Sequence, residues 1–129
     1  MIALLVGIAL ERGAIASLDD PAEKEVPAIK GSGYAPVSIR NLLRMGSGMP
    51  FNERYDGNDD IARMNAALYA TRPGFAEFVR GQKARDYPPG EKFNYASIAA
   101  VLLGRVLEGA TTRDVSALTS EWLWQPLGA

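Results

Sequence analysis

The sequence contains neither cysteine nor histidine. The absence of cysteine excludes disulfide bonds and thiol nucleophiles, and the two absences together exclude Cys/His zinc sites and every Ser-His-Asp arrangement. Any hydrolytic chemistry in this chain therefore has to use Ser, Lys, Tyr or carboxylate side chains. A chain without cysteine is compatible with an oxidising or a reducing compartment, so the localisation stays open between periplasmic or secreted and cytoplasmic.

Neither sign of charge dominates the sequence. The 14 Lys and Arg residues nearly balance the 15 Asp and Glu residues, and no run of like charge forms a basic stripe that would neutralise phosphates. We therefore expect no nucleic-acid partner. We also expect no metal ion and no cofactor.

Long hydrophobic runs are absent as well. The longest, Ile2 to Leu10, is too short for a transmembrane helix, which needs about 20 apolar residues. It is also a poor signal peptide, because no Lys or Arg precedes it and Glu11-Arg12 interrupts it before any cleavage site. The run predicts instead a helix over 1–12 that ends at Gly13 and, being apolar on nearly all sides, is fully buried. We expect no membrane anchor.

Strand patterns are missing too, since no segment alternates with period two and no hairpin dipeptide joins two such segments. Helical periodicity and helix punctuation occur throughout, and 129 residues with 47% hydrophobic composition suffice for one compact domain. The sequence predicts a mainly α domain over residues 1–129. The expected helices cover 1–12, a short segment that begins at Ser38, 59–72, 75–80, 96–108 up to Gly109, and 111–125 before Pro126.

Three polar residues invite a chemical interpretation, and each also has a structural one. Ser47 lies between two glycines, which is typical of a tight turn in which Ser bonds to the local backbone. Tyr95 and Ser97 lie at the start of the 96–108 helix, where Tyr95 would anchor a loop to the core and Ser97 would satisfy first-turn amides. As a base at neutral pH, a phenol with a pKa of about 10 needs a nearby cation.

Four motifs in order carry a resemblance to a known family: Leu18-Asp19-Asp20-Pro21, the segment Val37 to Met49, the segment Pro89 to Ser97, and Pro126-Leu127-Gly128. Together they resemble the class C β-lactamase-like serine hydrolases. That family includes class C β-lactamases, D-alanyl-D-alanine peptidases, esterases and 6-aminohexanoate-oligomer hydrolases, and the last branch is the most similar. The resemblance covers about residues 4–128 and implies the helical portion of an α+β fold, which forms one wall of an active-site cleft.

The resemblance also implies roles for two residues. Tyr95 matches the tyrosine that assists proton transfer to and from a serine nucleophile and the leaving group, with a lysine ammonium holding its pKa down. Two residues later the family often has Asn, which bonds to that lysine or to the substrate. Ser97 occupies this position, so it is the expected substrate-binding residue. The implied substrates are small-molecule amides or esters.

The family's nucleophile motif, Ser-x-x-Lys, is missing. None of the seven serines is followed by Lys at the third position, and Lys30-Gly31-Ser32 lies too early to be the family's strand triplet. We expect the chain to be an internal fragment, with Ser-x-x-Lys just upstream of Met1 and the sheet absent. Such a fragment would be inactive alone and would self-associate through its exposed sheet-docking face.

Two alternatives remain open at this point. In the first alternative, the chain is a non-catalytic helical interaction module derived from the same scaffold, and Tyr95 has only a packing role. In the second alternative, the chain is an esterase that uses only residues present in it, with Ser47 as nucleophile.

Overall fold

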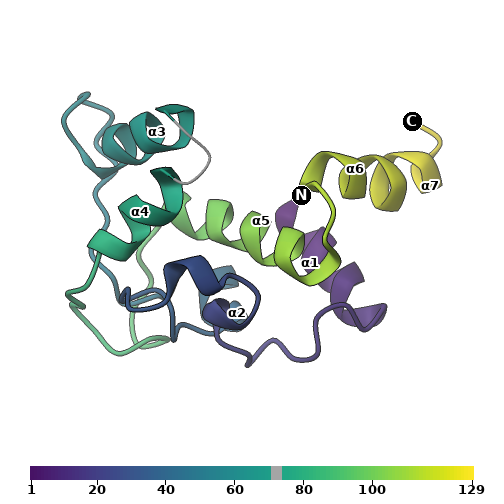
Figure 1. Ribbon diagram of the computed structural model, residues 1–129, viewed down its shortest axis with the longest axis horizontal. Helices are drawn as coiled ribbons and strands as arrows, with labels where there is room; N and C mark the ends of the chain where they lie inside the picture. Colours follow the sequence, from purple (N-terminus) through teal and green to yellow (C-terminus); the bar gives the residue numbers. More distant parts are fainter. Residues whose placement is uncertain (71–73) are drawn as a thin grey trace.

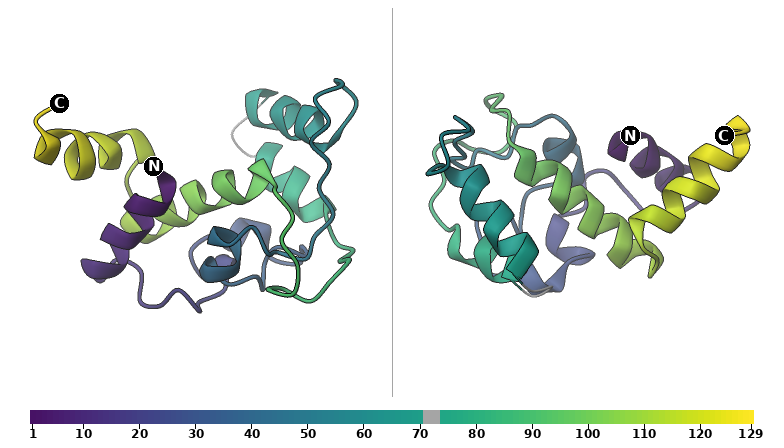
Figure 2. Two further views of the ribbon diagram at one scale, coloured as in Figure 1. Left: turned by 180° about the vertical axis from the view of Figure 1, so that it is seen from behind. Right: turned by 90° about the horizontal axis from the view of Figure 1, so that it is seen from above.

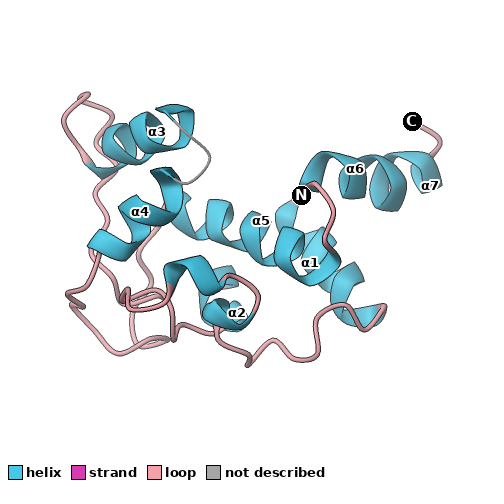
Figure 3. Cartoon of the chain, in the orientation of Figure 1, coloured by secondary structure: helices cyan, strands magenta, loops and turns pink. Residues whose placement is uncertain are grey.

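The computed structural model describes residues 1–70 and 74–129, and this part of the chain is helical without a β-strand (Figures 1 and 3). A single isolated bridge between Pro21 and Ser38 is the only strand-like pairing within it. The predicted mainly α class is confirmed. The elements in chain order are α1 (Ile2–Glu11), η1 (Ala22–Lys24), η2 (Pro27–Ile29), α2 (Ile39–Leu43), α3 (Asp60–Ala70), α4 (Gly74–Gly81), α5 (Ser97–Thr111), α6 (Val115–Thr119), η3 (Ser120–Trp124) and α7 (Gln125–Leu127).

Helix α5 lies at the centre of the arrangement. Helices α1, α2, α3 and α6 and the short helix η1 all contact it (Figures 1 and 2). Its apolar side is buried as the periodicity predicts, and the buried residues are Ile98, Ala99, Leu102, Leu103, Val106 and Leu107. Burial of a Leu side chain contributes about 1.5–3 kcal/mol, so this stripe supplies much of the core.

The end of α5 differs from the prediction. The helix continues past Gly109 to Thr111, and Thr112 takes the left-handed conformation with φ 55°. Gly109 serves a close approach instead, because a Cβ there would lie 1.9 Å from the carbonyl oxygen of Glu25. Glycine allows η1 and the following residue to pack directly on the helix backbone.

Helix α1 is only half buried, so the prediction of full burial is wrong. Leu5, Val6 and Ala9 are buried, whereas Leu4 is 63% exposed and Met1 is equally open. Helix α1 packs against α5 and also contacts η3, and Leu4 lies on the side that stays exposed. The predicted end is confirmed, since Gly13 takes a positive φ of 76° just after Arg12.

The C-terminal segment is helical for longer than predicted. It passes from α6 through one wide π turn, η3, and continues through Pro126 to Leu127 in α7. The π turn shifts the backbone register ahead of a residue that has no N–H to donate, which explains why Pro126 does not end the helix. Leu118 and Trp122 are buried as predicted, and the Arg12 guanidinium lies 4.8 Å from the Trp122 ring centroid.

The remaining helices agree with their sequence signals. Ser38 caps α2, since its hydroxyl oxygen accepts the Asn41 N–H at 3.1 Å. Helix α4 covers the predicted 75–80 segment, and α3 covers the 59–72 segment up to Ala70. Residues Thr71 and Arg72 of that prediction lie outside the described residues. None of the described helices is both long enough and apolar enough to cross a membrane.

The close contact at Gly109 leads to a first prediction. Gly109→Ala places a methyl group against the Glu25 carbonyl and should lower the free energy of unfolding by about 2–3 kcal/mol. Gly7→Ala is the matched control, because a Cβ at this position in α1 meets nothing within 4 Å. It should stabilise the chain by about 0.5–1 kcal/mol through helix propensity. Urea unfolding of the two variants measures both effects, and equal free energies of unfolding for the two variants would contradict the close contact at Gly109.

Candidate active site

A cavity of about 630 Å³ opens beside the N-terminal end of α5. Four parts of the chain line it: the segment from Gly48 to Glu53, Asp60 at the start of α3, the Asp86–Tyr87 pair, and the segment from Lys92 to Tyr95 that leads into α5. Its lining combines aromatic rings with carboxylates and one ammonium group. The lining residues are Gly48, Met49, Pro50, Phe51, Asn52, Glu53, Asp60, Asp86, Tyr87, Lys92, Phe93, Asn94 and Tyr95.

Tyr95 presents its side chain to this cavity. It is 58% exposed, and its hydroxyl makes no hydrogen bond to another described residue. An aromatic residue that only anchored a loop to the core would be buried with its hydroxyl paired. The Tyr95 phenol is therefore open to solvent at the cavity wall, and its catalytic role stays a prediction.

Lys92, three residues before Tyr95, is the ammonium group on the same wall. Its Nζ lies 4.2 Å from the centroid of the Tyr87 ring, which is a cation–π contact. The position of the Lys92 ammonium group is therefore set by an aromatic ring and not by a carboxylate of the described residues. This places a positive charge in the cavity that Tyr95 also lines.

Ser97 is held by a residue far away in the sequence. Its hydroxyl donates to Glu53 Oε1 at 2.7 Å, and its backbone N–H donates to Glu53 Oε2. The half-buried side chain lies just outside the residues that line the cavity. The Ser97 hydroxyl thus already has a partner within the chain, and its expected role in substrate binding stays a prediction.

Glu53 was not found from the sequence. It contacts Ser97 across 44 positions of sequence, and no local pattern indicates such a pair. Its Oε1 also accepts the Tyr55 hydroxyl at 2.9 Å, and this hydrogen bond raises the pKa of Tyr55. One carboxylate thus joins the loop after Pro50 to the start of α5.

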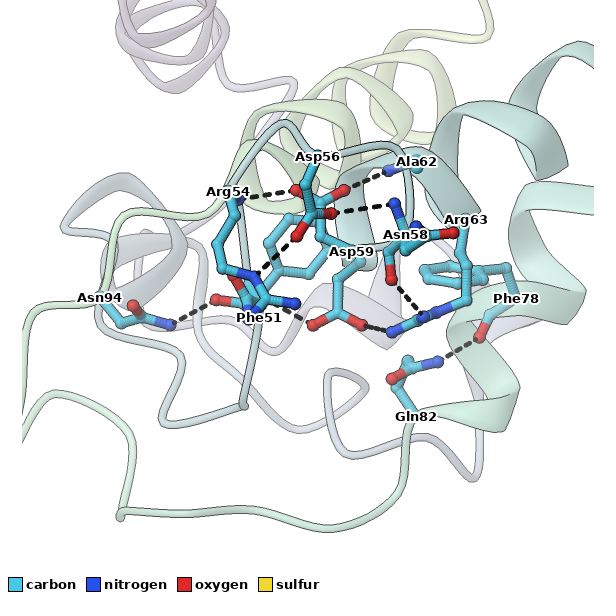
Figure 4. Close-up of polar contacts among 12 residues, drawn as sticks. Phe51, Arg54, Asp56, Asn58, Asp59, Ala62, Arg63, Phe78, Gln82 and Asn94 are labelled. Atoms are coloured by element: carbon cyan, nitrogen blue, oxygen red, sulfur yellow. Dashed lines mark hydrogen bonds and ion pairs between the residues drawn. The ribbon is translucent and has the colours of Figure 1, made fainter.

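The loop that carries Glu53 is ordered by Asp59, whose side chain is buried and is drawn among the polar contacts of Figure 4. Its carboxylate accepts the N–H groups of Arg54 and Tyr55, both at 2.6 Å, and that of Ala62 at 3.1 Å. Burial alone would raise the pKa of Asp59, but these backbone hydrogen bonds outweigh it and lower the pKa below the usual 3.8. The bonds also hold Tyr55 in a left-handed conformation with φ 59°.

Ser47 lies in the predicted turn. It is only 7% exposed, and its hydroxyl oxygen accepts the Met49 N–H at 3.2 Å. Gly48 takes φ 76°, and a Cβ there would lie 1.9 Å from the Tyr87 carbonyl oxygen. The positive φ before the turn belongs to Met45 and not to Gly46. A buried hydroxyl engaged in its own turn gives no support to Ser47 as a nucleophile.

The part of the chain that the structure describes contains no group of three or more Asp and Glu side chains placed to hold a metal ion.

Comparison with known proteins identifies the family of the chain. The Beta-lactamase family model matches residues 1–129. The chain belongs to the beta-lactamase family. Its helices superimpose on a class C beta-lactamase with a TM-score of 0.76 and 20% identity over 98% of the chain and 32% of that structure, which shows the fold alone. The expectation that these helices form the helical portion of that fold is confirmed.

Two further similar proteins carry hydrolase names. A D-stereospecific amidohydrolase from Streptomyces sp. is 25% identical, with a TM-score of 0.73 over 98% of the chain and 39% of that structure. A putative D-alanyl-D-alanine carboxypeptidase from Escherichia coli K12 is 28% identical over 116 residues, which are 85% of the chain and 26% of that protein. The chain spans about a quarter of the length of the curated relatives it matches.

The lowered pKa of Asp59 leads to a second prediction. A carboxyl group whose pKa is lowered in the folded state stabilises the fold above its unfolded pKa, and this contribution is lost as the pH falls through the folded pKa. Asp59→Asn should therefore lower the thermal midpoint at pH 7, and the difference from the parent chain should shrink below pH 3.8. Calorimetry across this range measures it.

Asp86→Asn is the control for Asp59. Asp86 is an exposed carboxylate on the cavity wall whose side chain makes no hydrogen bond or ion pair with another described residue. Its removal should leave the midpoint at pH 7 unchanged. Equal midpoints for the parent and Asp59→Asn at pH 7 would contradict the role given to Asp59.

Proposed function

We propose that residues 1–129 supply the tyrosine-bearing wall of the active site of a serine hydrolase, which cleaves small-molecule amide or ester bonds through an acyl-enzyme. The observation that carries this proposal is the unpaired Tyr95 phenol on an open cavity, directly before a buried helix. The hydrolase names of the amidohydrolase and carboxypeptidase relatives support the reaction class.

Tyr95 transfers the proton in this scheme. A serine Oγ attacks the acyl carbon of the substrate and gives its proton to the phenolate of Tyr95, which passes it to the leaving amine or alkoxide. Water then attacks the ester of the acyl-enzyme and gives its proton to the same phenolate, which returns it to the serine Oγ as the acid is released.

The serine itself has to come from outside these 129 residues. None of the chain's serines is followed by Lys at the third position, and Ser47 is buried in its turn. Residues 1–129 alone should therefore not turn over an activated ester. The coding sequence upstream of Met1 tests this directly: an in-frame Ser-x-x-Lys supports the proposal, and a stop codon there favours the non-catalytic module.

Substitution of Tyr95 provides the third prediction. In the protein that carries the upstream Ser-x-x-Lys, Tyr95→Phe should slow acylation by an activated ester or a β-lactam about 10²–10⁴-fold, because it removes the proton carrier and leaves the ring. Tyr69→Phe is the matched control, since Tyr69 is 88% exposed on α3 and lies away from the cavity. Full activity of Tyr95→Phe would overturn the proposed role.

Self-association through α1 is the fourth prediction. We propose that the exposed side of α1 around Leu4 docks a sheet in the longer protein and pairs with a second copy when that sheet is absent. Leu4→Lys should shift the 129-residue chain towards monomer in sedimentation equilibrium, whereas Tyr69→Lys should not. A parent chain that is monomeric at high concentration would contradict this.

A further inference from the structure

We propose that Glu53 is a positioning residue that caps helix α5 from outside the helix and thereby holds Tyr95 at the cavity. The capping is argued from the contacts of this chain alone. Its effect on catalysis rests on the function proposed above for Tyr95.

The start of α5 has no cap of its own. The first N–H groups of a helix lack intrahelical partners, and a Ser, Thr, Asp or Asn at the preceding position usually satisfies one of them. Here that position is Ala96, whose methyl side chain accepts nothing and whose backbone is extended. The Ser97 N–H donates instead to the carboxylate of Glu53. A negative charge at this end also complements the helix dipole.

The same carboxylate fixes Ser97 a second time. The Ser97 hydroxyl donates to Glu53 Oε1, so the residue is held through both its backbone and its side chain. Glu53 is itself fixed by the Tyr55 hydroxyl, and Asp59 holds the Tyr55 amide. The cap is therefore part of an ordered loop and not a mobile surface side chain.

Tyr95 lies between two anchored neighbours. On one side the Asn94 N–H donates to the Met45 carbonyl at 2.8 Å, and the Asn94 side chain reaches the Phe51 carbonyl at 3.4 Å (Figure 4). On the other side stands the Glu53–Ser97 pair. Because the phenol has no hydrogen bond of its own to a described residue, these two backbone anchors set where it points. Loss of the Glu53 anchor frees the segment at one end.

Amide exchange at position 97 tests the cap in the 129-residue chain. Glu53→Ala should accelerate exchange of this amide at least about tenfold, because the N–H then lacks a partner, while the Leu102 amide in mid-helix is unchanged. Glu53→Gln should retain most of the protection, since its carbonyl accepts the N–H and the hydroxyls of Ser97 and Tyr55 can rotate to accept from its amide.

Two more variants keep the test decisive. Ser97→Ala removes the hydroxyl but leaves the backbone N–H, so exchange at position 97 should stay slow. Asp86→Asn removes another carboxylate from the same cavity and should leave this exchange unchanged. If Glu53→Ala fails to fold, loss of protection in Ser97→Ala, or unprotected exchange in the parent chain, would still overturn the cap.

Acylation of the protein that carries Ser-x-x-Lys tests the positioning. Glu53→Ala should slow acylation about 10²-fold, the effect expected from displacing a reacting group by about 1 Å, and Glu53→Gln should restore most of the rate. Normal acylation in Glu53→Ala, with Tyr95→Phe inactive, would show that Glu53 does not position Tyr95. Full activity of Tyr95→Phe would instead overturn the proposed function. The exchange data would still test whether Glu53 caps α5.

Discussion

Burial of one side of α5 is the interaction on which the rest of the structure depends. The helix runs from the cavity to the C-terminal elements, and α1, α2, α3 and α6 each gain their place by contact with it. The stripe from Ile98 to Leu107 is apolar at helical spacing, so the helix can face the core in only one orientation. That orientation fixes which end of α5 meets the cavity and therefore where Tyr95 emerges.

The cavity wall is built differently, from carboxylates that satisfy backbone amides. The segment after Pro50 contains no regular helix until Asp60, and its N–H groups need partners all the same. Asp59 accepts two of them, Asp60 accepts the Asn52 N–H at 2.7 Å, and Glu53 reaches across to α5. These acidic side chains give an irregular loop a defined shape, which is the condition for presenting a phenol at a fixed point.

The distribution of apolar surface agrees with membership of the beta-lactamase family. Leu4 and Met1 are exposed on α1, and Phe93 and Tyr95 are exposed beside the cavity. The chain matches the family model over its whole length but only about a quarter of its curated relatives. The exposed apolar residues of α1 and those beside the cavity thus lie on two separate surfaces of this helical portion of the fold.

The sequence by itself determined the helical class, the buried stripe of α5, the Ser38 cap and the turn at Ser47, because each depends on spacing or on hydrogen bonds within a few residues. It also carried the motifs that indicate the family. Tertiary structure alone decided the half-exposure of α1, the continuation of α5 past Gly109 and the pairing of Glu53 with Ser97. The last two depend on partners distant in sequence, the Glu25 carbonyl and a carboxylate 44 residues away, and the first depends on which elements pack against α1. Local sequence patterns cannot predict such contacts, because the partners meet only when α5 packs in the folded chain.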